Sequence, residues 1–177
     1  MRVLVVAESV FGNTRRVAEE VAGGLADELG ATGEVRIADV TEPVEDLDGV
    51  DLLVVGGPTH AFAMTRMSTR RSAAEQAGDG AEPAETGLRE WLAALPEAPG
   101  RAQAAAFDTR VDRPRLPGSA AAGAARRLRR LGYRLVVRPE TFRVTGTRGP
   151  LREGELDRAR AWGAAVARAA TAAVGTA

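Results

Sequence analysis

The sequence contains no cysteine, no lysine and only one histidine, His60, among its 177 residues. The absence of cysteine excludes disulfide bonds, cysteine nucleophiles and iron–sulfur ligation by this chain. Because all 24 basic residues are arginine, the chain has no lysine for a Walker-type phosphate loop, a kinase site or a pyridoxal Schiff base. A single histidine also excludes zinc sites that need several histidines from one chain.

Long hydrophobic runs are absent as well. No apolar stretch approaches the roughly 20 residues of a membrane-spanning helix, and the apolar segment after Met1 is too short for a signal peptide. We therefore expect a single domain over residues 1–177, located in the cytoplasm and without a membrane span. Alanine is abundant, with 35 residues, so an individual alanine carries little information.

Apolar patterning predicts an α/β fold. Continuous apolar runs are typical of strands buried on both faces, and a spacing of three to four residues is typical of amphipathic helices. The expected strands are 3–7, 34–40, 51–55, 102–107 and 133–137, the last of which 141–144 could extend. The expected helices are 15–29, 88–95, 119–131 and 153–173. This order predicts a doubly wound, five-stranded parallel sheet with helices on both faces.

One long segment separates the third and fourth expected strands. Its middle, residues 72–85, is rich in alanine, glycine and glutamate and has no apolar periodicity. We therefore predict a flexible excursion at 72–85, before the helix that carries Trp91 and Leu92.

The loop after the first strand is a candidate anion site. It consists of Ser9, Val10, Phe11, Gly12, Asn13 and Thr14. Hydroxyl groups, a glycine and the start of a helix favour a phosphate, because backbone amides and the helix dipole are directed at it. The alternative interpretation is a simple helix N-cap made by Asn13 or Thr14.

This loop resembles the phosphate loop of the flavodoxin family, which usually ends in Gly-Asn-Thr. The segment Gly56-Gly57-Pro58-Thr59-His60-Ala61-Phe62 is similar to that family's first flavin-flanking loop, and residues 139–142 and 149–162 are similar to its later segments. The resemblance implies a flavodoxin-like sheet with strand order 2-1-3-4-5 and a noncovalently bound FMN. The FMN phosphate would lie on residues 9–14.

The resemblance also implies that the flavin ring lies between the second and third loops. The candidates are Pro58, Thr59, His60, Ala61 and Phe62 in the second loop, and Asp108, Thr109 and Arg110 in the third. Phe62 would either stack on the ring or anchor its loop in the core. His60 would be either an exposed imidazole or a general acid.

The third loop has no aromatic residue, although many flavodoxins place one there. Either the flavin is held more loosely, or its open face receives a substrate. Arg110 would raise the electron affinity of a flavin if it lay near the pyrimidine edge. The alternative is that Arg110 pairs with Asp108 or with solvent.

Charge is unevenly distributed along the chain. Residues 1–100 contain 8 arginines and 18 acidic residues, whereas residues 101–177 contain 16 arginines and 6 acidic residues. The loops expected to surround the cofactor carry Arg66, Arg70, Arg71, Arg110, Arg113 and Arg115, against Asp108 and Asp112. A basic entrance would attract anionic acceptors or acidic partners. We expect the arginine-rich run 126–130 to be a solvated helix face and not a nucleic-acid contact.

Several other functions are excluded by missing residues. A response-regulator receiver needs an acidic residue after the third strand and a lysine after the fifth, but Gly56-Gly57 follows the third strand and lysine is absent. The chain also lacks the glycine pattern of dinucleotide-binding folds and the G-x-S-x-G pattern of hydrolases. We interpret the acidic residues of segment 41–51, which are interspersed with Pro43 and Gly49, as a polar connection and not as a metal site. Three functions remain: an FMN electron carrier between an unidentified donor and acceptor, an NAD(P)H-dependent FMN reductase of quinones or similar acceptors, and a flavin-free binding module.

Overall fold

A parallel sheet forms the centre of the protein. The computed structural model describes residues 1–42, 47, 49–60, 63–77, 85–98, 102–113 and 117–174. The strands are β1 (Arg2–Ala7), β2 (Glu34–Asp39), β3 (Leu52–His60), β4 (Ala63–Met64), β5 (Gln103–Val111), β6 (Arg134–Leu135) and β7 (Glu140–Val144). The helices are α1 (Asn13–Leu29), α2 (Met67–Ala77), α3 (Leu88–Ala94), α4 (Ala120–Arg130) and α5 (Glu155–Val174), with a 3₁₀ helix at Gly30–Thr32.

The predicted strand order is confirmed. The strands lie in the order β2-β1-β3-β5-β6, β7 also pairs with β5, and all of these pairings are parallel. The fourth predicted strand is β5, and the fifth is divided into β6 and β7. Pro139, which lacks a backbone N–H for the ladder, precedes β7 and accounts for part of that division.

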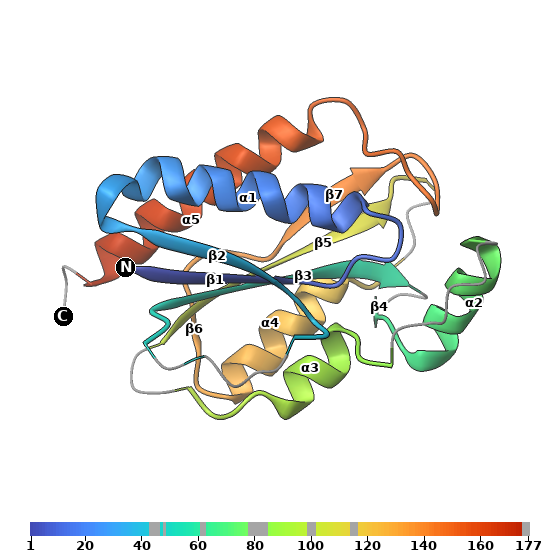
Figure 1. Ribbon diagram of the computed structural model, residues 1–177, viewed down its shortest axis with the longest axis horizontal. Coiled ribbons are helices and arrows are strands. Elements are labelled where there is room, and N and C mark those ends of the chain that lie inside the picture. The colour runs from blue at the N-terminus through green and yellow to red at the C-terminus, as the bar shows by residue number, and fades with distance from the viewer. Residues whose placement is uncertain are drawn as a thin grey trace.

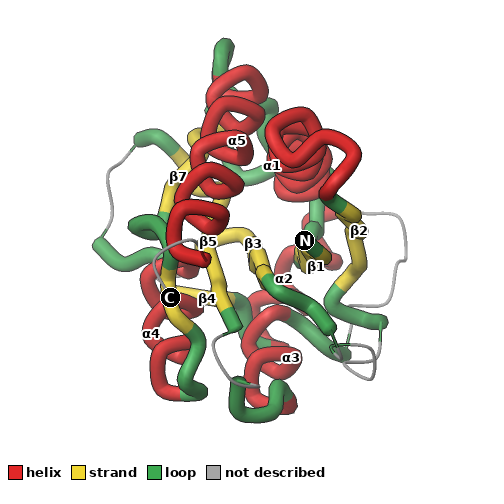
Figure 2. Tube along the Cα trace, turned by 90° about the vertical axis from the view of Figure 1, so that its left-hand side faces the viewer, coloured by secondary structure: helices red, strands yellow, loops and turns green. Residues whose placement is uncertain are grey.

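Helices cover both faces of the sheet, as Figures 1 and 2 show: α1 and α5 lie on one face, and α3 and α4 on the other. Alternate residues of β1 supply the two cores, so that Val5 packs under α1 and α5 while Val6 packs under α3 and α4. Trp162 packs against the first core and Trp91 lies in the second. Within the described residues, no helix is long and apolar enough to cross a membrane.

The backbones of α1 and α5 are in direct contact. A Cβ atom at Gly24 would overlap the backbone oxygen of Arg160, and one at Gly163 would overlap the backbone oxygen of Val21. The two helices can approach this closely only because both positions lack a side chain. The contact fixes α1, whose N-terminus lies at the end of β1.

Helix α2 was not expected from the sequence. It makes residues 72–77 helical, where we predicted an irregular excursion, and residues 78–84 lie outside the described part of the chain. The segment has little apolar periodicity, which is why the hydrophobic pattern did not reveal it. Its alanine, arginine, glutamate and glutamine residues nevertheless have high intrinsic helix propensity.

Candidate functional site

The loops at the carboxyl ends of β1, β3 and β5 are linked by hydrogen bonds. The N–H of Glu8 donates to the carbonyl of Gly56 at 3.0 Å. The hydroxyl groups of Thr14 and Thr109 lie 2.7 Å apart, and the Thr59 hydroxyl donates to Asp108 at 2.8 Å. The three segments predicted to surround a ligand are therefore adjacent in the structure.

The first loop ends in a helix start that is suited to an anion. Gly12 has a φ of 78° and precedes the first residue of α1, and nothing lies within 4 Å of the position that a Gly12 Cβ would occupy. The Ser9 hydroxyl accepts a hydrogen bond from the N–H of Arg15 at 3.2 Å. The first amides of a helix have no acceptor within the helix, so those of Asn13 and Thr14 suit an anionic ligand.

Two of the predicted phosphate ligands use their side chains elsewhere. The Asn13 side-chain amide donates to the carbonyl of Arg148 at 3.0 Å. The Thr14 side chain is buried and its hydroxyl pairs with Thr109. Neither residue caps α1 through its side chain, because Ser9 takes that role. In this arrangement Asn13 and Thr14 can offer an anion their backbone amides, and Asn13 also keeps the second N–H of its side-chain amide.

Arg148 lies near the first loop, and the sequence analysis did not single it out. It lies in the turn between β7 and α5, and its guanidinium carbon is 6.0 Å from the centroid of the Phe11 ring. Its carbonyl also binds Asn13, so the turn is attached to the start of α1. No local pattern around Arg148 indicates this position, because the approach depends on the whole path of β7. The side chain brings a positive charge to a loop that was predicted to rely on amides and hydroxyls.

The second loop is more regular than predicted. β3 continues through Pro58 and Thr59 to His60, then pairs antiparallel with β4. The Thr59 hydroxyl both donates to Asp108 and accepts from the N–H of Ala120 at 2.8 Å. Ala61 and Phe62, which follow His60 in the sequence, lie outside the described residues.

Asp108 is the central polar group of the third segment. It is fully buried, and its Oδ2 accepts hydrogen bonds from the hydroxyls of Thr59 and Ser119 and from the N–H of Ala121. Its Oδ1 has no partner among the described residues. Arg110, also predicted to lie at the flavin, donates to the carbonyl of Gly118. Asp108 therefore joins β3, β5 and the start of α4.

The buried carboxylate of Glu8 connects the end of the second loop to the start of α3. Glu8 accepts hydrogen bonds from the Thr65 hydroxyl at 2.6 Å and from the N–H of Leu88 at 2.8 Å. Arg70 donates to Thr65 at 3.1 Å and to Glu90 at 3.0 Å. Burial raises the pKa of the Glu8 carboxyl above its usual 4.5. Sequence analysis did not single out Glu8, because its partners lie far away in the chain.

The predicted basic entrance is wrong for Arg70. Arg70 is buried in the network around Glu8 and does not face the entrance, and Asp112 pairs with Arg152. Arg66, Arg71 and Arg113 are exposed, and Arg115 lies outside the described residues. Arg70 was misassigned because a buried acceptor network can hold a cation that sequence alone places on the surface.

We expect the pKa of His60 to lie below its usual value of 6.5. The side chain is half-buried, and desolvation lowers its pKa below 6.5. Because His60 is the only histidine, its imidazole proton signals can be followed by NMR without assignment, and we expect their midpoint below pH 6.5. The folded state then binds this proton less readily than the unfolded state, so stability falls as the pH falls from 6.5 through the folded pKa. A midpoint at or above 6.5 would contradict the burial of His60.

Comparisons of the sequence with family models and with curated proteins found no match. In the described part of the chain, no group of three or more acidic or histidine side chains is placed to hold a metal ion.

Comparisons with solved structures are more informative. Flavodoxin 2 from Bacillus cereus superposes with a TM-score of 0.67 at 20% identity, covering 95% of this chain and 99% of that one. A flavodoxin from the domain Archaea gives 0.63 at 18% identity, over 97% of this chain and 99% of that one. The fold is flavodoxin-like. A flavodoxin, WrbA-like protein from Agrobacterium tumefaciens gives 0.60 at 20% identity, over 96% and 97% of the two chains. The superpositions, which cover nearly the whole of each chain, establish the flavodoxin-like fold.

Proposed function

We propose that this protein binds FMN noncovalently at the carboxyl ends of β1, β3 and β5 and carries electrons between a reduced donor and an acceptor. The observation that carries the proposal is the start of α1, where the left-handed Gly12 leaves open space beside the first helical amides. The start of α1 lies at the end of β1, and the strand order of the sheet reverses between β1 and β3. Open α/β sheets bind ligands at that point.

The groups at the first loop fit a phosphate monoester. Ser9 and the N-terminal amides of α1 supply hydrogen bonds, and Arg148 supplies a positive charge within reach of the loop. A phosphate at a helix N-terminus needs no lysine, because the amides and the helix dipole stabilise its charge. The absence of lysine from this chain is therefore compatible with phosphate binding.

The flavin ring would lie between the β3–β4 hairpin and the third segment. His60 borders this space from the hairpin, and Asp108 keeps the two segments in register through Thr59. Bound FMN would accept one or two electrons and release them to an acceptor, while the protein sets its position and electrostatic environment. The Glu8 network holds the hairpin base against α3, so the ring would meet a fixed surface.

A reductase is the second candidate function. The sequence from Asp108 to Ser119 contains no aromatic residue, so no aromatic side chain of this segment can stack on the outer face of a bound ring. An open face would admit a nicotinamide donor and then a quinone acceptor. Oxidation of NADH or NADPH that depends on both FMN and a quinone would favour the reductase over the carrier.

The test of FMN binding is a titration of the flavin-free protein with FMN and with riboflavin. If the first loop holds the phosphate, FMN should bind about 10- to 100-fold more tightly than riboflavin, since charge-assisted hydrogen bonds contribute about 1.5–3 kcal/mol. Quenching of flavin fluorescence measures both affinities. Arg148→Gln should weaken FMN binding and leave riboflavin binding unchanged.

Gly12→Ala and Gly154→Ala form a matched pair for this test. Both glycines have a φ of 78°, and neither would place a Cβ within 4 Å of another atom. Both precede a helix, so both variants should carry a similar backbone strain of about 1–2 kcal/mol. Only Gly12→Ala should weaken FMN binding. Equal effects of the two variants, or no binding of FMN at all, would overturn the proposal and favour a flavin-free module.

A further inference from the structure

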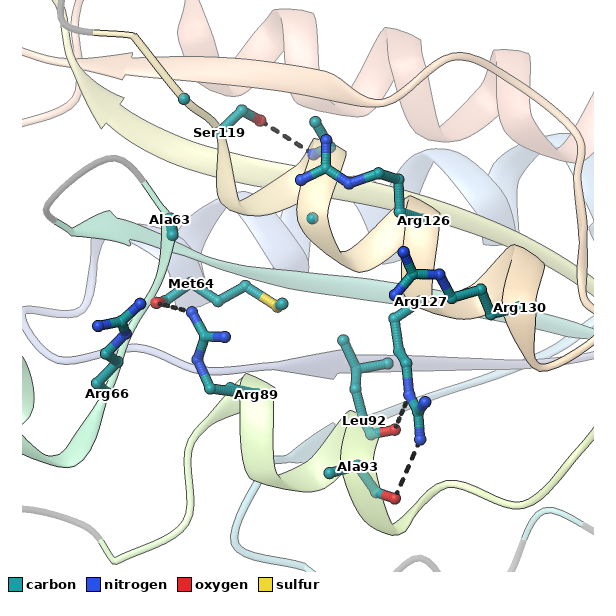
Figure 3. A pocket seen from close by; sticks show the side chains of 13 residues that line it. Ala63, Met64, Arg66, Arg89, Leu92, Ala93, Ser119, Arg126, Arg127 and Arg130 are labelled. Atoms are coloured by element: carbon teal, nitrogen blue, oxygen red, sulfur yellow. Dashed lines mark hydrogen bonds between the residues drawn. The ribbon is translucent and has the colours of Figure 1, made fainter.

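A cavity lies between the β3–β4 hairpin, the end of the third loop at Gly118 and Ser119, α3 and α4. Its volume is about 840 Å³. Five arginines line it, namely Arg66, Arg89, Arg126, Arg127 and Arg130. Figure 3 shows Arg66 and Arg89 on one side and the three α4 arginines on the other. We call this cavity the arginine pocket.

No carboxylate in the described part of the chain neutralises the charge of the arginine pocket. Among the described residues, none of the five guanidinium groups forms an ion pair with a carboxylate. The nearest acidic side chain in sequence, Glu90, follows Arg89 but pairs with the buried Arg70. Five like charges around one cavity repel one another, and an anion between them would relieve that repulsion.

Two of the five arginines are already fixed in place. Arg89 donates from Nε to the carbonyl of Thr65 at 3.1 Å and from Nη2 to that of Met64 at 3.0 Å. Arg127 donates from Nε to the carbonyl of Leu92 at 3.2 Å and from Nη2 to that of Ala93 at 3.4 Å. Each guanidinium keeps its Nη1 group for another acceptor, because an arginine carries five N–H donors. Arginines held in this way lose little conformational freedom when they bind a ligand.

The remaining lining leaves room for a flat organic group. Gly123, Ala122 and Ala93 are small, and the half-buried Met64 and the buried Leu92 provide an apolar surface between the two groups of arginines. A cavity of several hundred Å³ with an apolar floor and a few fixed polar groups is typical of small-molecule sites. Guanidinium planes also stack on aromatic rings.

We propose that the arginine pocket binds a phosphorylated small molecule with at least two phosphate groups, of the nucleoside di- or triphosphate class. Arginines from two facing walls can contact separate phosphates, and the apolar floor suits a base. A long nucleic acid would instead need a strip of cations along the surface, whereas these arginines surround one hollow. The proposal does not require bound flavin, because no phosphate-loop residue lines the pocket, although Gly118 and Ser119 at the end of the third loop do.

The experiment is calorimetric titration of the full chain with ATP, ADP, AMP and inorganic phosphate, without Mg²⁺ and at low ionic strength. We expect affinity to fall in the order ATP, ADP, AMP, phosphate, and to weaken as salt is added. The same titrations in the presence of saturating FMN should give the same order. They separate this site from the flavin site, since a failure of FMN to bind would leave the nucleotide result unchanged.

Arg130→Glu and Arg129→Glu form a matched pair on α4. Both side chains are exposed and lie in the last turn of the helix, but only Arg130 lines the pocket. Arg130→Glu should weaken ATP binding by about tenfold or more, as expected for loss of a charge-assisted contact, and Arg129→Glu by less than about threefold. Arg66→Glu, compared with the exposed and non-lining Arg71→Glu, repeats the test from the opposite wall.

Three results would overturn the proposal: no heat with any nucleotide at low salt, equal weakening by Arg129→Glu and Arg130→Glu, or tighter binding of single-stranded oligonucleotides as their length increases. The second result would show a diffuse charge effect, and the third an extended nucleic-acid surface. Circular dichroism checks that each variant is folded. Because the tested side chains are exposed and make no ion pair among the described residues, all four should retain the fold.

Discussion

Gly24→Ala is expected to lower the free energy of unfolding by about 1–2 kcal/mol, measured by urea denaturation. The new Cβ would overlap the backbone oxygen of Arg160 in α5, and a backbone atom cannot move aside without moving the helix. Overpacking of this kind typically costs about 1–3 kcal/mol and exceeds the gain of up to about 1 kcal/mol in helix propensity. The same argument applies to Gly163→Ala, whose Cβ would overlap the backbone oxygen of Val21.

Gly23→Ala is the control, one residue away on the same helix. Its Cβ would meet only the end of the Arg160 side chain, which can move. That side chain pairs with Glu20 and Asp27 at an exposed position, where an ion pair contributes about 0–1 kcal/mol. Gly23→Ala should therefore leave stability nearly unchanged or raise it slightly. If the two variants were equally stable, the helices would not be in backbone contact at Gly24.

The second large effect is expected from Asp108→Ala. Removing this buried carboxylate leaves the hydroxyls of Thr59 and Ser119 and the N–H of Ala121 without their acceptor. The Ala121 N–H is buried and costs about 1–3 kcal/mol without a partner, and the two half-buried hydroxyls add a smaller cost, so we expect a loss of about 2–3 kcal/mol of unfolding free energy. Because the same contacts hold the second and third segments together, FMN affinity should fall as well. Urea denaturation and flavin titration measure the two effects separately.

Asp112→Ala provides the comparison in the same segment. Its carboxylate pairs with Arg152, whose side chain is 53% exposed, so its loss should cost no more than about 1 kcal/mol. Asp108→Asn keeps the size of the side chain and one acceptor oxygen, and should lie between the two. Unchanged stability of Asp108→Ala would mean that the donors around Asp108 find other acceptors and that this residue does not organise the site.

The sheet was largely predictable because each central strand is a continuous apolar run. In β1, for example, every residue from Val3 to Ala7 is buried, and such a run has few other interpretations. The lengths of β3 and β5 were underestimated because their last residues, from Gly56 to His60 and from Asp108 to Val111, mostly lack an apolar pattern. Their ladder pairing, not their composition, makes them strands.

The candidate site was predictable in position but not in detail. The three loops were found because the fold brings the carboxyl ends of adjacent strands together. The orientation of the Thr14 and Thr59 hydroxyls depends on Thr109 and Asp108, which lie 95 and 49 residues away in the chain. The residues next to Thr14 and Thr59 in the sequence do not indicate these pairings. A hydroxyl that binds a ligand therefore cannot be distinguished, from the sequence alone, from one that links two strands.

The arginine-rich run of α4 shows a similar limit. Residues 126–130 were predicted to be a solvated face, and Arg126, Arg129 and Arg130 are indeed exposed, whereas Arg127 is half-buried. The sequence did not show that Arg126, Arg127 and Arg130 also line a cavity whose other wall comes from α3 and β4, elements that lie more than 30 residues earlier. A run of charged residues indicates which face of a helix is charged, but it does not indicate which other elements lie opposite that face.

The placement of the two tryptophans on opposite sides of the sheet gives the protein a pair of built-in optical probes. Trp162, a residue of α5, contacts Phe107 and Phe142 edge-on at ring-centroid distances of 6.0 and 6.1 Å, whereas Trp91, a residue of α3, is buried in the core on the opposite face of the sheet. Fluorescence from each indole, isolated by replacing the other with phenylalanine, reports on one layer alone. Loosening of the helices that flank the arginine pocket can thereby be distinguished from loosening around the first loop without attaching any label.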